Sequence, residues 1–243
     1  MSVFLDHYVT RVASSIFEYP EAMAYLHARG ITDDEIRRYS IGYSTLITPK
    51  NDGSMDYSDL KKKSHDWLSL KGKLIFPVTS CNGIVTGVVA RRLDVKGKPV
   101  DDKIPRYKHL MVAGAEASGS FFGFPQASEH ILKAGFAYIV EGTVDCISLA
   151  KVFPNCVSTL TSMINVSQMW TLRMVGDCAV VVFDPDAAGL KGAKKALEDY
   201  GEKLIVVRDI GYGDPNKCLV EMGLSGFMQY AKSKLRYIHF SKG

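Results

Sequence analysis

Acidic residues follow two apolar runs of the chain, at the point where each run ends. Glu141 comes directly after Ala137–Val140, and Asp184 and Asp186 come directly after Cys178–Phe183. If both runs are strands of one parallel sheet, their carboxyl ends lie at the same edge, which is where open α/β sheets place their ligands. We therefore expect these three carboxylates to converge on one site.

Two further acidic residues extend this group. Asp145 lies one helical turn beyond Glu141, and Asp214 lies in the loop after Lys203–Val207, with Asn216 two residues further on. Crowded carboxylates repel one another, and hard oxygen ligands of this kind suit Mg²⁺ or Mn²⁺. Such a cluster supports two-metal phosphoryl or nucleotidyl transfer, because the ions activate a hydroxyl, polarise the phosphate and stabilise the leaving oxygen.

Each acidic residue also has a structural interpretation. Asp214, which a proline follows, is typical of a helix N-cap. Asp145 could be an exposed helical residue, and Glu141 could favour a helix N-terminus through the helix dipole. The Asp-x-Asp pair that begins at Asp184 could belong to an aspartate-nucleophile phosphatase, although that chemistry usually has Thr or Val where this chain has Ala188. The combination at three strand ends is more specific than any single residue.

The pattern from about residue 125 onward alternates between strands and helices. Strands are expected over 137–140, 156–160, 178–183 and 203–207, and helices over 144–152, 166–175, 188–200, shortly after Asp214, and over 225–236. Strands that are apolar throughout, separated by amphipathic helices, favour a parallel sheet. We therefore predict an α/β domain over residues 125–243, with a mainly parallel central sheet covered by helices.

The first half has a different pattern. Residues 4–40 are expected to be helical, with Gly30 at a helix end and a capping box formed by Thr32 and Glu35. Lys73–Val78 and Ile84–Ala90 are expected to form a hairpin around an Asn-Gly turn. Residues 44–60 and 94–120 are expected to be irregular. This predicts an α+β subdomain over residues 1–124, with a boundary near 118–128.

Composition excludes several classes of protein. The chain has 243 residues, of which 47% are hydrophobic and 23% charged, as in ordinary globular proteins rather than disordered, collagen-like or coiled-coil chains. Its apolar runs are too short to cross a bilayer, and no secretory signal pattern is present. Five scattered cysteines without zinc-ligand spacing predict neither a disulfide framework nor a structural zinc. We expect a cytoplasmic protein that does not associate with membranes.

Positive charge is concentrated in one stretch. Between Lys61 and Lys108 there are 12 Lys and Arg against 4 Asp, a local balance of +8, whereas the whole chain carries +4. Such a stretch indicates a polyanionic partner, such as a nucleic acid or nucleotide phosphates. The alternative is a solvated lysine-rich loop, and charge alone does not decide between them.

The acidic motifs resemble the Toprim module of primases, topoisomerases and some nucleases. The matching runs are IVEGTVD at 139–145, FDPDAAG at 183–189 and DPN at 214–216. The resemblance implies that Glu141, Asp184 and Asp186 are the core acidic residues that hold catalytic Mg²⁺. It places Asp145 and Asp214 at secondary metal-binding positions. Asn216 stands where many members carry a second Asp, and a ligand of lower charge should weaken any metal held there.

The first half resembles the RNA polymerase domain of bacterial and phage DNA primases. The matching runs are AYLHARG at 24–30, IGY at 41–43, GKLIFPV at 72–78, GVVAR at 87–91, IPRYK at 104–108 and FGF at 122–124. The resemblance implies nucleotide or template binding by Arg29, Arg91, Arg106, Tyr107 and Lys108. Arginine grips phosphate through parallel hydrogen bonds. Tyr107 has two open interpretations, stacking on a base or packing beneath the loop.

Together these features predict a DNA primase catalytic subunit, which synthesises short RNA primers on single-stranded DNA by metal-dependent nucleotidyl transfer. The expected partners are the single-stranded template, ribonucleoside triphosphates, a replicative helicase and a separate zinc-binding template-recognition protein. A phage origin is expected, with the bacterial host cytoplasm as the location. The alternatives are a Toprim-type metal-dependent DNA nuclease and a non-catalytic nucleic-acid-binding subunit.

Overall fold

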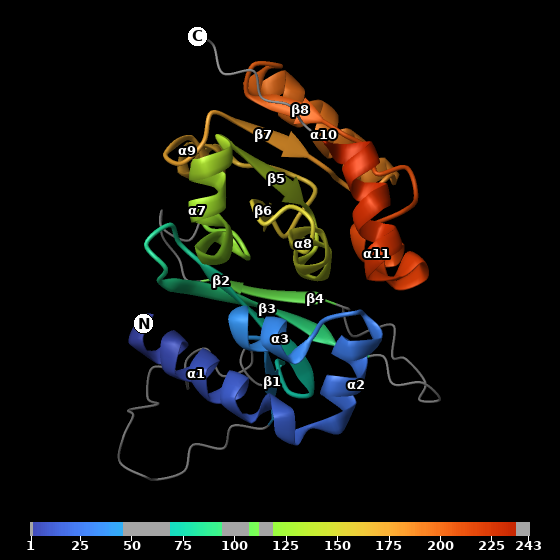
Figure 1. Ribbon diagram of the computed structural model, residues 1–243. Coiled ribbons are helices and arrows are strands. Elements are labelled where there is room, and N and C mark those ends of the chain that lie inside the picture. Colours follow the sequence, from blue (N-terminus) through green and yellow to red (C-terminus); the bar gives the residue numbers. More distant parts are fainter. Residues whose placement is uncertain (1, 46–68, 94–106, 112–118, 237–243) are drawn as a thin grey trace.

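Two four-stranded sheets form the framework of the computed structural model, which describes residues 2–45, 69–93, 107–111 and 119–236 (Figure 1). Sheet A is antiparallel, in the order β1-β2-β3-β4, and sheet B is parallel, in the order β6-β5-β7-β8. The strands of sheet A are Gly42–Ser44, Lys73–Thr79, Val85–Arg92 and Tyr107–Met111. Those of sheet B are β5 Phe136–Val140, β6 Cys156–Ser158, β7 Cys178–Val181 and β8 Ile205–Val207.

The expected α/β arrangement with a parallel sheet is confirmed in the second half. The helices there are α7 Phe124–Ala134, α8 Thr143–Ala150, α9 Val166–Arg173, α10 Ala187–Tyr200 and α11 Pro215–Leu235. Gly223, with φ 68° and ψ 169°, interrupts α11, which corresponds to the two expected helices. Helix α7 is not among the expected elements, although Phe124, Ala127 and Ile131 are buried at helical spacing.

The helical start of the chain is confirmed as well. It consists of α1 Ser2–Ser15, a 3-10 turn, α2 Pro20–Ala28 and α3 Asp33–Arg38. The Thr32 side chain accepts a hydrogen bond from the Glu35 amide, and the Glu35 carboxylate accepts one from the Thr32 amide. Gly30 has a φ of 72°, a left-handed conformation that ends the helix before it.

The hairpin is confirmed, but the expectation that residues 94–120 are irregular throughout is wrong. Strand β4, Tyr107–Met111, pairs with the open edge of β3, where Arg91 lies opposite Tyr107. Strand β1 likewise pairs with β2, from Gly42 opposite Ile75 to Ser44 opposite Lys73. Neither short strand has an alternating apolar pattern of its own. Each is therefore defined by its pairing with the neighbouring strand and not by its own sequence.

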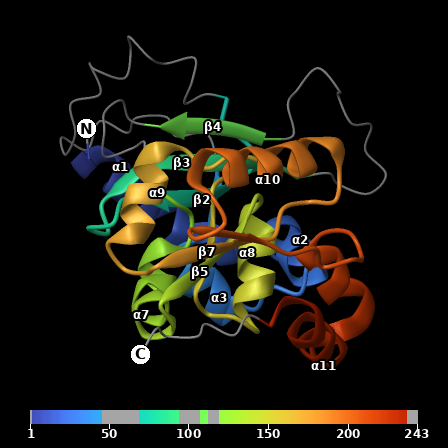
Figure 2. The ribbon, with the colours of Figure 1, turned by 90° about the horizontal axis from the view of Figure 1, so that it is seen from above.

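Helices cover both faces of sheet B, and one face also meets sheet A. On one face, α7, α9 and α10 pack against a core that includes Ala137, Ile139 and Val181. On the other, α8 and α11 share a continuous core with Phe76 and Val78 of sheet A. In Figure 1 sheet A and the N-terminal helices form the lower half, and Figure 2 shows α7 at the left and α11 at the right of the view.

Two sets of contacts join the two halves of the chain. Phe121 bridges to Thr79, the last residue of β2 in sheet A, and the next residue, Phe122, bridges to Ser158 of β6. Lys151, after α8, places its ammonium 2.6 Å from the Glu35 carboxylate of α3, with both side chains largely buried. The domain boundary between residues 124 and 125 stays a prediction.

In the part of the chain that the structure describes, no helix has the length and apolarity to cross a membrane.

Candidate active site

Glu141 and Asp184 meet at the carboxyl ends of β5 and β7, whose arrowheads point to the same side in Figure 1. A Glu141 carboxylate oxygen accepts a hydrogen bond from the Asp184 backbone amide at 3.0 Å. The close approach requires glycine at position 189, because a Cβ there would lie 2.1 Å from the Asp184 carbonyl oxygen and 2.7 Å from Glu141 Oε1. The expected convergence of strand ends is therefore present for these two residues.

Asp186 lies at the same edge and caps a helix. Its side chain accepts a hydrogen bond from the Gly189 amide at 2.8 Å and forms the N-cap of α10. The side chain is exposed, whereas Glu141 and Asp184 are partly buried. Asp186 therefore combines a structural contact with an accessible carboxylate whose charge acts on Glu141 and Asp184.

Asp145 and Asp214 form the second acidic corner. Asp145, in the first turn of α8, accepts a hydrogen bond from the Asn216 amide at 3.1 Å. Asp214 is the N-cap of α11 and accepts a hydrogen bond from the Lys217 amide at 2.6 Å, so the structural interpretation of this residue is confirmed. Asp214 is also close enough to Asp145 and Asp184 to raise the pKa of both carboxyls.

Burial and mutual repulsion hold the pKa of these carboxyls above their usual range. Burial, followed by the charges of Asp184 and Asp186, raises the pKa of Glu141 to about 7. Burial, followed by the charges of Asp214 and Asp186, raises the pKa of Asp184 to about 6. Burial and then Asp214 raise the pKa of Asp145 as well. These shifts reflect the cost of burying each carboxylate and, to a smaller extent, of placing several anions together.

The donor set fits a hard divalent cation in its chemistry. All five carboxylates offer oxygen ligands, and a cation would offset the repulsion that, together with burial, raises the pKa of Glu141, Asp145 and Asp184. Within residues 2–45, 69–93, 107–111 and 119–236, no three His, Cys, Asp or Glu side chains are grouped closely enough to hold a metal ion. For the same reason, no group of side chains in those residues could hold a zinc ion.

Ser158 supports Glu141 from the neighbouring strand and is a residue that the sequence did not reveal. Its hydroxyl donates to the Glu141 carbonyl oxygen at 2.6 Å and accepts from the Leu160 amide at 3.0 Å. Leu160 has a φ of 69°, which is strained for a leucine. Backbone strain of this kind persists where surrounding contacts enforce it, and here those contacts fix the backbone behind Glu141.

Arg29 reaches the acidic corner through Asn216. The Arg29 guanidinium donates to Asn216 Oδ1 at 3.1 Å, and Asn216 Nδ2 donates to the Arg29 carbonyl at 2.8 Å and to the Ser148 hydroxyl at 2.9 Å. Asn216 is 2% exposed. Its amide is therefore engaged by protein groups at the position where the family resemblance suggests an acidic residue.

Arg91 and Tyr107 are in direct contact with each other. The Arg91 guanidinium lies 5.0 Å from the centre of the Tyr107 ring and donates a hydrogen bond to the Tyr107 hydroxyl. Arg91 is 4% exposed, whereas Tyr107 is 38% exposed. Tyr25, which the sequence analysis did not select, lies within 5.5 Å of Arg29 and 5.3 Å of Arg91, measured from the ring centre.

Lys108 lies on the other face of sheet A from Arg91, because successive side chains of a strand alternate and the register places Tyr107 opposite Arg91. Lys108 instead neighbours Lys73 and Arg92. Burial, and then the charges of Lys108 and Arg92, lower the pKa of Lys73. Arg106 lies outside the described residues. The structure thus brings Arg29 and Arg91 toward the acidic corner and separates Lys108 from Arg91.

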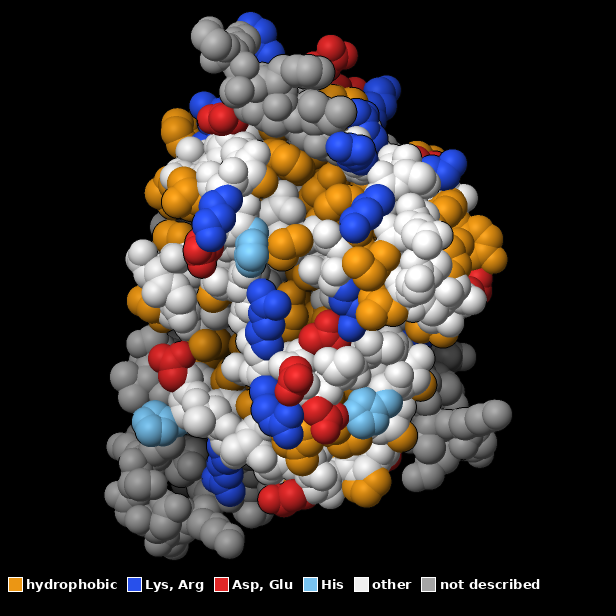
Figure 3. All heavy atoms as spheres, viewed as in Figure 1, with side chains coloured by type: hydrophobic (Ala, Val, Ile, Leu, Met, Phe, Trp, Pro, Cys, Tyr) orange, Lys and Arg blue, Asp and Glu red, His pale blue; other side chains and the backbone are white. Residues whose placement is uncertain are grey.

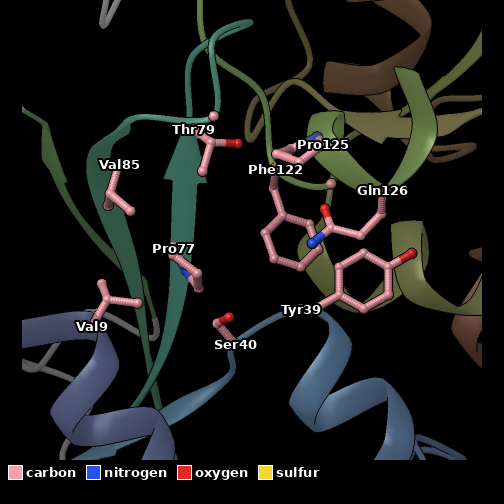
Figure 4. Close-up of a pocket in the computed structure, with 11 residues that line it drawn as sticks. Val9, Tyr39, Ser40, Pro77, Thr79, Val85, Phe122, Pro125 and Gln126 are labelled. Carbon is pink, nitrogen blue, oxygen red and sulfur yellow. The ribbon is translucent and has the colours of Figure 1, made fainter. Parts of the chain in front are cut away.

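A cavity of about 200 Å³ lies elsewhere, between the N-terminal helices, the hairpin and the start of α7. Tyr39, Phe122 and Pro77 line it, as Figure 4 shows, and none of its lining residues is acidic. On the face viewed in Figure 1, acidic and basic side chains are intermixed rather than separated (Figure 3). The carboxylates at the strand ends are therefore the better candidate for chemistry.

Residues 138–219 match the family model described as Toprim-like, so the expected Toprim resemblance is confirmed. The resemblance to the catalytic core of DNA primases is confirmed too. This chain is 27% identical over 209 residues to the DNA primase of Aquifex aeolicus, and 26% identical over 224 residues to that of Lactococcus lactis. These alignments cover 80% and 84% of this chain, but only 41% and 34% of the relatives.

Solved structures establish the fold. The DnaG catalytic core matches 96% of this chain and 79% of its own chain, with a TM-score of 0.75 and 19% identity. The Escherichia coli primase catalytic core matches 96% and 80%, with a TM-score of 0.71 and 19% identity. The Aquifex aeolicus structure, which contains zinc-binding and RNA polymerase domains, matches 93% and 60%, with a TM-score of 0.69 and 23% identity.

Proposed function

We propose that this chain carries the catalytic activity of a DNA primase and joins ribonucleotides on a single-stranded DNA template. The observation that carries the proposal is the meeting of Glu141 and Asp184 at the carboxyl ends of β5 and β7. The similarity to DNA primases extends over four-fifths of the chain and supports the same activity. In the reaction, a terminal 3′-hydroxyl attacks the α-phosphate of the next nucleotide and pyrophosphate leaves.

Glu141, Asp184 and Asp186 are the residues that would hold divalent cations, with Asp145 and Asp214 as secondary ligands, and their side chains would draw closer together around a bound ion than they lie in the described structure. When bound there, Mg²⁺ or Mn²⁺ supplies positive charge that activates the attacking hydroxyl and stabilises the leaving group. The raised pKa of Glu141 supports this assignment, because a carboxyl that is costly to ionise alone gains from a cation. The missing Cβ of Gly189 leaves room for the Glu141 side chain, and the Ser158 hydroxyl holds the Glu141 backbone carbonyl.

The basic residues would bind the polyanionic reactants. Arg29, beside the acidic corner, is placed to attract triphosphate or template phosphates, and Tyr107 exposes part of its ring for stacking on a base. Arg91 holds the Tyr107 hydroxyl from behind. Lys108 lies on the opposite face of sheet A, where it would attract the phosphates of a different part of the nucleic acid or of the approaching template.

The remaining parts of the proposal concern partners and setting. One structural neighbour is a DnaG primase catalytic domain bound to single-stranded DNA, and another contains a zinc-binding domain beside the RNA polymerase domain. We infer that this chain acts on single-stranded DNA and ribonucleoside triphosphates, with a replicative helicase and a zinc-binding template-recognition protein as partners. A phage origin and action in a bacterial cytoplasm complete the proposal.

The test is synthesis of labelled oligoribonucleotides on single-stranded DNA, with Mg²⁺ or Mn²⁺, by the chain alone and with a helicase or zinc-binding primase partner added. Template-dependent product supports the proposal. Metal-dependent loss of a labelled DNA, without nucleotide incorporation, would replace it with the nuclease alternative. Binding of DNA with neither reaction under any partner condition would favour a non-catalytic subunit.

A further inference from the structure

Tyr25 brings two cationic side chains to one aromatic ring. The guanidinium carbon of Arg29 lies 5.5 Å from the ring centre, and that of Arg91 lies 5.3 Å from it. Tyr25 and Arg29 are four residues apart and meet across the last turn of α2, whereas Arg91 comes from β3 of sheet A. The negative face of an aromatic ring attracts guanidinium groups, most strongly where water is excluded.

The polar atoms around this ring indicate that the face of the Tyr25 ring, and not its hydroxyl, makes the contacts with the two arginines. The Tyr25 hydroxyl and Arg91 Nε are both buried without a hydrogen-bond partner in the described structure. No carboxylate of those described residues forms an ion pair with Arg29 or Arg91. Among the described residues these two guanidinium groups share one aromatic ring without an ion-paired carboxylate, and the Tyr25 ring supplies a favourable contact to each.

Each guanidinium group continues into a different part of the site. Arg29 donates to Asn216, whose backbone amide donates to Asp145 of the acidic corner. Arg91 donates to the hydroxyl of Tyr107, whose ring is partly exposed. The ring of Tyr25 thus contacts both arginines, of which Arg29 is linked to the acidic corner and Arg91 to Tyr107.

We propose that Tyr25 is a positioning residue for binding of single-stranded nucleic acid, acting through Arg29 and Arg91. Its ring contacts the two cations without neutralising their charge, and no carboxylate of the described residues is ion-paired with either of them. A carboxylate in its place would cancel that charge and weaken attraction to phosphate. This inference rests on the proposed function, because the role requires that the chain bind a single-stranded polyanion.

Two substitutions of Tyr25 separate the ring from the hydroxyl. Tyr25→Leu removes the ring and keeps an apolar side chain, and we expect it to weaken binding of a fluorescent single-stranded DNA by about 10-fold, as loss of two cation–π contacts implies. Tyr25→Phe keeps the ring and removes an unpartnered hydroxyl, so it should bind DNA as the wild type does. Thermal unfolding of both variants checks that the fold is retained.

Binding that is unchanged in a folded Tyr25→Leu protein would overturn the inference, and so would equal weakening in both variants. A second readout does not depend on function: the Nε–Hε NMR resonances of Arg29 and Arg91. The Tyr25 ring current should displace them in the wild type and in Tyr25→Phe, but not in Tyr25→Leu. Unshifted resonances in the wild type would refute the arrangement. If the wild type shows the shifts but binds no single-stranded DNA, the proposed function fails and the role of Tyr25 in binding fails with it.

Discussion

Asn216 and Arg29 exchange two hydrogen bonds although they lie 187 residues apart in the chain. The Arg29 guanidinium donates to Asn216 Oδ1 at 3.1 Å, and Asn216 Nδ2 returns a hydrogen bond to the Arg29 carbonyl at 2.8 Å. Because the Asn216 amide also donates to Ser148, all of its polar atoms have protein partners. These hydrogen bonds join the end of α2 to the start of α11, next to Asp145, which accepts a hydrogen bond from the Asn216 backbone amide.

The first prediction concerns the charge at position 216. Asn216→Asp removes the donor that serves the Arg29 carbonyl and the Ser148 hydroxyl and places a further carboxylate beside Asp145, and we expect these losses to outweigh the attraction that the new carboxylate gains from the Arg29 guanidinium. We expect a loss of about 2 kcal/mol in unfolding free energy near neutral pH. Protonation at low pH should relieve part of the loss, so denaturant titrations at several pH values should show a difference that grows as the pH rises. A difference independent of pH would contradict this explanation.

The second prediction follows from the raised pKa values of Glu141 and Asp184. Folding favours their protonated forms, so their contribution to stability is fully present below their usual pKa range and is lost as pH rises through about 6 and 7. The protein in a chelator should therefore lose thermal stability between about pH 4 and pH 7. Mg²⁺ or Mn²⁺ should raise the melting temperature more at the higher pH, because protons and cations compete for the same oxygens.

The matched variant for that measurement is Asp184→Asn, which removes one charge from the crowded carboxylates. It should flatten the pH dependence of the melting temperature and reduce the effect of the cation. A cation effect of equal size in Asp184→Asn would show that the metal binds elsewhere. The same pH profile in wild type and variant would contradict the repulsion that the structure implies.

The third prediction tests the contact between the two halves. Lys151→Met leaves the largely buried Glu35 carboxylate without its cation and should cost about 3 kcal/mol of stability. The control is Lys195→Met, which breaks an exposed pair with Asp199 and should cost less than about 0.5 kcal/mol. Chemical denaturation of both variants measures the difference, and equal losses would mean that the Glu35–Lys151 pair contributes no more than a surface pair.

The fourth prediction concerns the glycine between the two central carboxylates. Gly189→Ala would place a methyl group 2.1 Å from the Asp184 carbonyl and 2.7 Å from Glu141 Oε1, so the backbone behind both residues must move. We expect a loss of about 2 kcal/mol in stability, together with a large loss of activity. Gly226→Ala in α11 is the control, because the nearest atom to its Cβ is a side-chain carbon at 3.2 Å. An active, stable Gly189→Ala protein would contradict the described site.

Much of the second half could be predicted from local pattern. Continuous apolar runs such as Cys178–Val181 announce buried parallel strands, and once the strands are parallel their carboxyl ends must share an edge. That reasoning brought Glu141 and Asp184 together correctly. Helix α7 was missed for a different reason. Its apolar spacing is helical, but the Gly, Ser and Pro residues around it favoured a boundary.

Contacts between distant segments could not be predicted in the same way. Strand β4 owes its existence to the open edge of β3, which nothing within Tyr107–Met111 reveals. The pairing of Arg29 with Asn216, and the placing of Tyr25 beside Arg91, depend on how α2 packs against α11 and sheet A. Periodicity and capping describe neighbours along the chain, so they identify such residues only through the separate resemblance of a motif.

The most direct test of the central claim compares primer synthesis by wild type, Asp184→Ala and Asp199→Ala. Asp184 lies at the strand end beside Glu141, whereas Asp199 is an exposed carboxylate paired with Lys195 on α10. Incorporation of labelled ribonucleotides on single-stranded DNA, with Mg²⁺ or Mn²⁺ and any partner the wild type requires, should fall by more than about 100-fold in Asp184→Ala and stay near wild type in Asp199→Ala. Undiminished synthesis by a folded Asp184→Ala protein would contradict the proposed active site.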